Sequence, residues 1–80
     1  MAIFRCLFVG GGFCPGGTNL EKARNILEDR LHTIAGEASK PIRVKHYNDG
    51  SKLYECYQLG PAKGMIISGF TDNPDPDFLN

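Results

Sequence analysis

A glycine-rich segment, GGGFCPGGT at residues 10–18, separates two stretches of the chain that differ in periodicity. Residues 2–9 before it, AIFRCLFV, are apolar on both alternating faces, which is typical of a strand that is covered on both sides. The chain after it repeats its apolar residues at helical spacing. The sequence therefore predicts a strand, a glycine-rich loop and a helix, in that order.

The helical stretch carries start and stop signals at its two ends. Thr18 and Glu21 form the T-N-L-E pattern of a capping box, in which the threonine hydroxyl accepts a hydrogen bond from a free backbone N–H. Gly36 is a residue type that commonly ends helices, and Pro41 prevents continuation. We expect the helix to begin at Thr18 and its leucine-rich stripe to face the sheet. Its polar residues, Arg24 among them, are then expected on the outer face.

Three further strands are predicted in the second half of the chain. Residues 42–47 alternate apolar and polar side chains, residues 52–59 carry large β-forming side chains, and the N-D-G-S turn between them favours a hairpin. A second turn leads to a short strand at residues 65–68. Residues 72–80, DNPDPDFLN, hold two prolines and lack periodicity, so we expect an extended or mobile acidic tail.

These elements predict one small α+β domain at residues 1–71, followed by the tail at residues 72–80. The order is β-α-β-β-β, with one helix packed on one face of a mainly antiparallel sheet of three or four strands. Because one helix covers only one face, apolar side chains on the other face predict an interface. We expect Phe4, Phe8 and Tyr54 to form it, either in a homo-oligomer or with a protein partner.

The glycine-rich segment is a candidate ligand site. Residues 11–18 match the spacing of a phosphate-binding P-loop, except that Gly17 occupies the lysine position. Backbone N–H groups and the positive end of the helix dipole favour an anion at such a place. The alternative is a connection whose glycines only allow a tight turn. On the first interpretation a small anionic or nucleotide ligand is bound by Gly11, Gly12, Phe13, Cys14, Gly16, Gly17 and Thr18.

Residue patterns typical of catalysis, metal binding or a bound cofactor are missing from the sequence. Cys14 lacks the arginine of a C-x5-R phosphatase motif, because Leu20 stands there. His32 and His46 are isolated from other ligating side chains, and the aspartates of residues 72–80 lack the glycine and glutamate of a calcium loop. The three cysteines form no C-x-x-C pair. We therefore expect a protein that is not an enzyme and that has no metal and no cofactor.

Charge and hydropathy limit the classes of partner and the cellular compartment that we expect. Nine basic and nine acidic residues cancel, while residues 1–71 hold nine bases against six acids, a net of +3. This excess is far below the footprint of a dedicated DNA-binding protein, so a nucleic-acid partner is disfavoured. No stretch reaches the roughly 20 apolar residues of a membrane span, and an arginine interrupts the apolar N-terminal run, which disfavours a signal peptide. We expect a cytoplasmic protein with reduced thiols and no membrane partner.

Three functions remain open on these residues. The first is a small binding protein that sequesters a nucleotide or another phosphate-bearing ligand at the glycine-rich loop, with Phe13 or Tyr57 stacking on a base. The alternative is a compact inhibitor or adaptor that binds a partner protein through its open sheet face, and its size is typical of phage proteins that counter host defence. A weaker alternative is an RNA-binding sheet surface, on which basic residues are interleaved with tyrosines. The residues concerned are Arg43, Lys45, Lys52 and Lys63, with Tyr47, Tyr54 and Tyr57.

Overall fold

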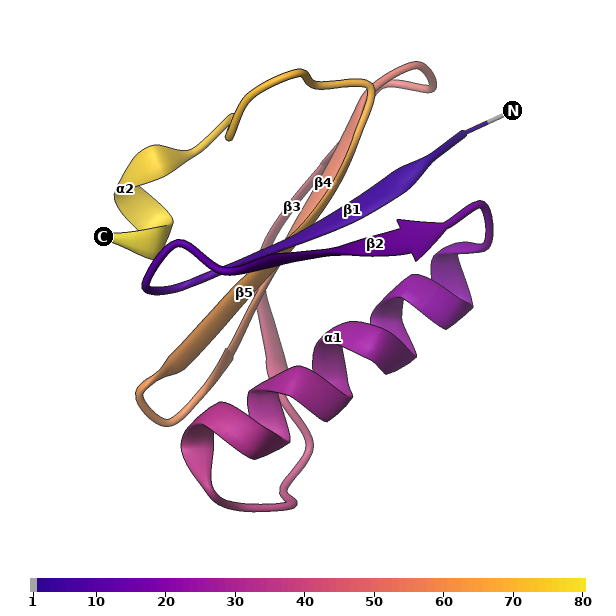
Figure 1. Ribbon diagram of the computed structural model, residues 1–80. Coiled ribbons are helices and arrows are strands. Elements are labelled where there is room, and N and C mark those ends of the chain that lie inside the picture. The colour runs from indigo at the N-terminus through magenta and orange to yellow at the C-terminus, as the bar shows by residue number, and fades with distance from the viewer. Residues whose placement is uncertain (1) are drawn as a thin grey trace.

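A computed structural model describes residues 2–80 and shows a five-stranded antiparallel sheet (Figure 1). A long helix lies on one face of the sheet, and a short C-terminal helix lies on the other. In chain order the elements are β1 (Phe4–Phe8), β2 (Phe13–Gly17), α1 (Leu20–Ala35), β3 (Ile42–Asn48), β4 (Leu53–Leu59), β5 (Ala62–Ser68) and α2 (Pro76–Leu79). The strands follow the order β2-β1-β5-β4-β3 across the sheet.

The glycine-rich segment forms strand β2, where the sequence predicts a loop. Gly10 and Gly11 have φ angles of 89° and 92°, a conformation that favours glycine, and they turn the chain so that β2 pairs antiparallel with β1. Pro15 is tolerated because β2 is an edge strand, which needs hydrogen bonds on only one side. The predicted order β-α-β-β-β with three or four strands is therefore wrong, since the chain folds as β-β-α-β-β-β-α with five strands. The coarser prediction of an α+β domain, with a long helix on an antiparallel sheet, is confirmed.

Helix α1 begins later than the sequence predicts. Asn19 is the N-cap instead of Thr18, and its side-chain oxygen accepts a hydrogen bond from the backbone N–H of Lys22 at 3.2 Å. The difference arises because β2 occupies the preceding residues and leaves Thr18 in the turn. The predicted end of the helix is confirmed. Gly36 adopts the left-handed backbone conformation, with φ of 71°, and its N–H donates to the carbonyl oxygen of His32 at 2.9 Å.

The predicted hairpin in the second half of the chain is confirmed as β3 and β4. Asp49 stabilises the turn between the two strands, because its Oδ1 accepts hydrogen bonds from the backbone N–H groups of Lys52 (2.7 Å) and Ser51 (3.1 Å). The bond from Lys52, a bond from the Tyr47 hydroxyl and the bond from Ser51 lower the pKa of Asp49 to about 2. Strand β5 then pairs with both β4 and β1, so it is the central strand of the sheet.

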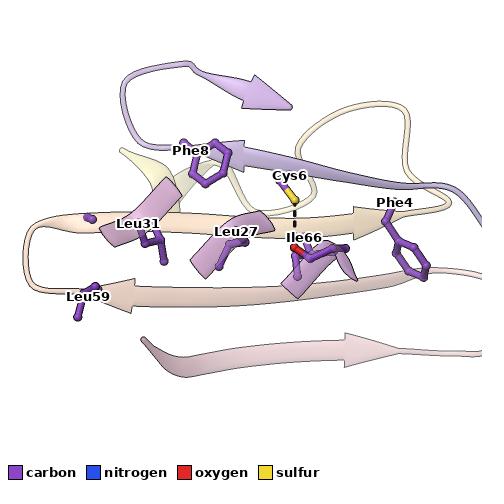
Figure 2. Close-up of a cluster of buried hydrophobic side chains, with 9 residues drawn as sticks. Phe4, Cys6, Phe8, Leu27, Leu31, Leu59 and Ile66 are labelled. Atoms are coloured by element: carbon purple, nitrogen blue, oxygen red, sulfur yellow. Dashed lines mark hydrogen bonds between the residues drawn. The ribbon is translucent and has the colours of Figure 1, made fainter. Parts of the chain in front are cut away.

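The main core lies between α1 and the sheet (Figure 2). Alternate residues of β1, β4 and β5 meet the inner face of the helix there, and burial of these side chains supplies most of the favourable free energy of folding. Its buried members are Phe4, Cys6, Phe8, Ala23, Leu27, Leu31, Leu59, Ala62 and Ile66.

A second, smaller cluster lies on the opposite face, where the C-terminal segment covers it. The guanidinium of Arg5 donates to the carbonyl oxygens of Phe70 (2.8 Å) and Thr71 (3.0 Å), and the ammonium of Lys45 pairs with Asp75 at 2.5 Å. Residues that the sequence predicts to be extended or mobile therefore lie against the sheet and end in α2. The cluster is formed by Cys56, Met65 and Ile67, with Phe70, Phe78 and Leu79 packed against them.

The three residues predicted to form an interface lie in different places. Phe4 and Phe8 belong to the main core beneath α1 and so add nothing to a free surface. Tyr54 lies on the opposite face, where its ring stacks on Tyr47 at a centroid distance of 5.8 Å and meets the Phe70 ring edge-on at 6.0 Å. The chain's own C-terminal segment thus covers the centre of the sheet face that α1 leaves open.

Candidate functional site

The residues predicted to bind a ligand at the glycine-rich segment are spread along a hairpin. Gly11 and Gly12 lie in the turn beyond Phe8, whereas Gly17 lies opposite Phe4 at the other end of β1. The two ends of such a strand are roughly 13 Å apart. The backbone N–H groups of this segment therefore do not converge on the N-terminus of α1 as they do in a P-loop.

The remaining residues of that predicted site also point to different surroundings. Phe13 is 69% exposed, whereas Cys14 is half-buried against the main core. Gly16 packs so closely on α1 that a Cβ atom there would lie 3.0 Å from the Cβ of Ala23. Thr18 is exposed in the turn before the helix.

A cleft on another part of the molecule gathers polar side chains. Helix α1 packs mainly on β2, β1 and β5, so a hollow of about 490 Å³ remains between the helix and the β3–β4 side of the sheet. A volume of this size suits a small molecule. The cleft is lined by Glu21, Arg24, Asn25, Leu27, Glu28, Lys40, Pro41, Arg43 and Tyr57.

Glu55 of β4 is a buried carboxylate, 4% exposed, that is held by three of the cleft residues. Arg24 of α1 donates to both of its oxygens, from Nε to Oε1 (2.9 Å) and from Nη2 to Oε2 (2.7 Å). The Tyr57 hydroxyl donates to Oε1 at 2.8 Å, and Nη1 of Arg43 lies 3.5 Å from Oε2. The two parallel bonds from Arg24 are the bidentate geometry that makes arginine–carboxylate pairs strong and directional.

This network keeps Glu55 ionised at neutral pH. Burial raises the pKa of Glu55, but the hydrogen bonds from Arg24 and Tyr57 and the charge of Arg43 outweigh burial, so the pKa lies below its ordinary value of 4.5. Burial and the bond to Glu55 raise the pKa of Tyr57, which therefore remains a neutral donor. The bond to Glu55 also raises the pKa of Arg24, which remains charged.

The arrangement of these side chains follows from helix and strand periodicity. Glu21, Arg24, Asn25 and Glu28 recur at intervals of three and four residues, so they share one side of α1. Oε1 of Glu21 also accepts a hydrogen bond from Nη1 of Arg24 at 2.6 Å, which orients the guanidinium further. Glu55 lies on the α1 face because alternate residues of β4 point to that face.

Lys40 and Arg43 bring positive charge to the β3 side of the cleft. Lys40 is an exposed residue shortly before β3, and Arg43 lies within the strand, next to an irregularity in its pairing with β4. Among residues 2–80, Arg43 makes one ion pair, with Glu55, at the long distance of 3.5 Å. The guanidinium has five donors, so most of them remain available to a ligand.

Sequence reasoning missed the pairing of Arg24 with Glu55. The helical pattern places Arg24 on the outer face, but its side chain is 32% exposed and turned towards the sheet. One signal was present: an acid inside a strand of large apolar residues, LYECYQL, requires a basic partner when that strand is buried. Arg43 and Tyr57, expected on an RNA-binding sheet surface, line the cleft instead.

Across residues 2–80, no group of three or more His, Cys, Asp or Glu side chains could hold a metal ion. The helices of that same part of the chain are too short or too polar to cross a membrane. Comparison with protein-family models, curated proteins and solved structures gave no match.

Proposed function

We propose that this protein is a non-catalytic binding protein that sequesters a small anionic ligand, such as a nucleotide, in the cleft between α1 and the β3–β4 side of the sheet. One observation carries the proposal. Arg43 and Lys40 supply positive charge to a hollow of about 490 Å³, beneath which the Arg24–Glu55 pair is held in place. Polar groups that are ordered before binding lower the entropy lost on binding, and they are typical of small-ligand sites.

The two sides of the cleft suit the two ends of a nucleotide. On the β3 side, Arg43 and Lys40 offer charge and N–H donors to phosphate oxygens. On the α1 side, Glu28 and Asn25 offer acceptor oxygens to the amino group of a base. A phosphate bound at the β3 side avoids the carboxylate of Glu28, so the charges set the direction of the ligand. Tyr57 adds an aromatic ring to the lining for stacking.

This proposal keeps the ligand class that the sequence predicts and moves the site from the glycine-rich segment to the cleft. A role without catalysis is favoured by the engagement of Glu55. Both of its oxygens accept hydrogen bonds from Arg24, and Oε1 accepts a second one from Tyr57. A carboxylate that is paired in this way has a low pKa and is a poor general base.

Thermal unfolding with a panel of nucleotides and inorganic phosphate tests the proposal. A ligand at about 100 times its Kd stabilises the folded protein by about 2.7 kcal/mol, which raises the Tm of a domain this small by roughly 10 °C or more. Titration calorimetry then compares the parent with Arg43→Ala and Lys40→Ala, which should each weaken binding about tenfold or more. Lys22→Ala, which removes a helix lysine outside the cleft lining, is the matched control. The proposal would be contradicted if no ligand of the panel raised the Tm, or if Arg43→Ala bound the ligand as tightly as the parent does.

A second candidate function, binding of a partner protein, is favoured by the exposure of β3. Every residue of this edge strand is exposed, and Ile42 and Val44 keep 67% and 51% of their surface. An extended segment of another protein can add to such an edge. Because Arg43 and Lys45 make the strand basic, an acidic segment fits better than a second copy of β3, which would bring like charges together.

Cross-linking of a captured partner, followed by mass spectrometry, tests this second function. We expect the cross-links to map to Lys45 of β3 and to Lys40 shortly before it. Ile42→Asp should weaken the complex about tenfold or more. Ile34→Asp changes an exposed isoleucine on α1 and should leave the affinity unchanged. An affinity that Ile42→Asp does not alter, or a partner that proves to be a second copy of this chain, would argue against it.

A further inference from the structure

Two free cysteines lie directly opposite each other on neighbouring strands. Cys6 of β1 and Cys14 of β2 are register partners in the antiparallel pair. The Cα atoms of such partners lie about 4.5–5.5 Å apart, and disulfides join Cα atoms that are about 4.4–6.8 Å apart. Both residues belong to the α1 face, because both pack in the main core. The backbone therefore already has the spacing that a disulfide requires.

The two thiols differ in their access to solvent. Cys6 has no exposed surface, and its thiol donates to the carbonyl oxygen of Ala23 on α1 at 3.7 Å (Figure 2). Burial, together with the charge and the hydrogen bond of the neighbouring Cys14 thiol, raises the pKa of Cys6 to about 12. Cys14 is half-buried and lines an open hollow with Ile26 and Arg30 of α1. A small reagent therefore reaches Cys14 first and finds Cys6 directly behind it.

We propose that Cys6 and Cys14 are a modification site at which a peroxide forms a reversible cross-strand disulfide. The Cys14 thiol, after loss of its proton, attacks one oxygen of hydrogen peroxide, which breaks the O–O bond and leaves a sulfenic acid and water. The sulfur of Cys6 then attacks the sulfur of Cys14, and the Cys6 proton leaves with the displaced hydroxide as the second water. In total, two thiols are oxidised to one disulfide, and one hydrogen peroxide is reduced to two waters.

The third cysteine defines the selectivity of this reaction. Cys56 lies in the second cluster, on the opposite face of the sheet from Cys6. The folded sheet therefore separates Cys56 from both partners. The Cys6–Cys14 pair is also distinct from the proposed ligand cleft, since Cys14 meets a different side of α1 from the one that carries Arg24. A disulfide here would tie the edge strand β2 to β1 and leave the cleft in place.

Peptide mapping tests the proposal on the parent protein, because trypsin separates the cysteines in an informative way. Cleavage after Arg5 and Lys22 leaves both members of the pair in the peptide of residues 6–22, and cleavage after Lys52 and Lys63 leaves Cys56 in another peptide. The folded, reduced protein is treated with hydrogen peroxide, alkylated and digested. We expect the first peptide to lose two hydrogens and resist alkylation until dithiothreitol is added, while the second stays alkylated.

Variants and a denatured control show whether the disulfide forms because of the folded geometry or only because the two cysteines are close in sequence. Cys56→Ser should form the same intrapeptide disulfide, whereas Cys14→Ser should leave Cys6 reduced. The same treatment in denaturant should scatter the bonds and include Cys56, because no sheet then separates the thiols. The proposal is overturned if the peptide of residues 6–22 remains fully alkylated, if Cys14 stops at sulfinic acid, or if the folded protein links Cys56 as readily as Cys6.

Discussion

Arg24 and Glu55 join α1 to β4 through two parallel hydrogen bonds, although they are separated by 31 residues in the chain. The carboxylate is almost fully buried, whereas the guanidinium is about one-third exposed. Burial of the carboxylate costs solvation energy that the pairing must offset. The pair therefore contributes more to the position of the helix than to net stability. Loss of one partner should lower the free energy of unfolding more than loss of both, because it leaves a buried charge unpaired.

A double-mutant cycle on this pair is our first prediction. Arg24→Leu leaves Glu55 buried without its main partner and should lower the free energy of unfolding by roughly 1–3 kcal/mol. Arg24→Leu combined with Glu55→Leu should lower it less, because no buried charge then remains. Urea unfolding measures all four members of the cycle. Lys22→Leu, an exposed change on the same helix, serves as the control, and a double variant less stable than Arg24→Leu would contradict the reasoning.

The low pKa of Glu55 leads to a prediction about acid stability. A carboxylate whose pKa is depressed in the folded state contributes stability that is complete above its unfolded pKa, here 4.5, and is lost as the pH falls through the folded pKa. The parent should therefore lose stability below pH 4.5 more steeply than Glu55→Gln, which has no proton to bind at this position. Asp49, whose pKa falls to about 2, contributes in the same direction and is present in both proteins. Equal slopes for the two proteins in chemical unfolding from pH 5 downwards, in steps of about half a unit, would rule out this role.

The elements that could be predicted from the sequence are those with local signals. The helix stop at Gly36 and the N-D-G-S hairpin turn each need only neighbouring residues. Strand β2 could not be predicted, because glycine and Pro15 disfavour strands and only pairing with β1 imposes the extended backbone. Helix α2 was hidden for a similar reason, since Phe78 gains its order by packing on the cluster around Met65.

The candidate site was less visible still. In the sequence, Arg43 and Tyr57 are recognisable as a basic and an aromatic residue, and Glu55 as an acid within an apolar strand. Arg24 is an ordinary charged residue of a helix, and the sequence does not indicate that it pairs with Glu55. Their pairing depends on how far α1 extends across the sheet, which is a property of the whole fold. The ligand prediction at the glycine-rich segment depends on the P-loop-like spacing of a few neighbouring residues. In the structure these residues form strand β2 instead of the loop that this spacing predicts.

Close packing of Gly16 on the helix gives a third prediction. A Cβ atom at this position would lie 3.0 Å from the Cβ of Ala23 and 3.2 Å from the carbonyl oxygen of Phe4, and neither atom can move without the backbone. Gly16→Ala should therefore lower the free energy of unfolding by roughly 1–3 kcal/mol, the usual cost of overpacking. Gly12→Ala is the matched control, because a Cβ there meets no atom within 4 Å. Thermal unfolding that ranks the two variants equally would show that α1 and β2 are not in close contact.

The cover of the second sheet face is the basis of our last prediction. Phe78 of α2 packs against the buried cluster that contains Met65, and the ammonium of Lys63 lies 5.7 Å from the centre of the Phe78 ring. Deletion of residues 72–80 also removes Asp75, the partner of Lys45. Exposed apolar patches on a sheet promote association, so the shortened chain should have a larger mass than the full chain in light scattering at the same concentration. Phe78→Ala should shift the mass in the same direction by a smaller amount, and Asp77→Ala, an exposed change in the same helix, should not. If the deletion leaves the mass unchanged, this face needs no cover, and its cluster is stable without the C-terminal segment.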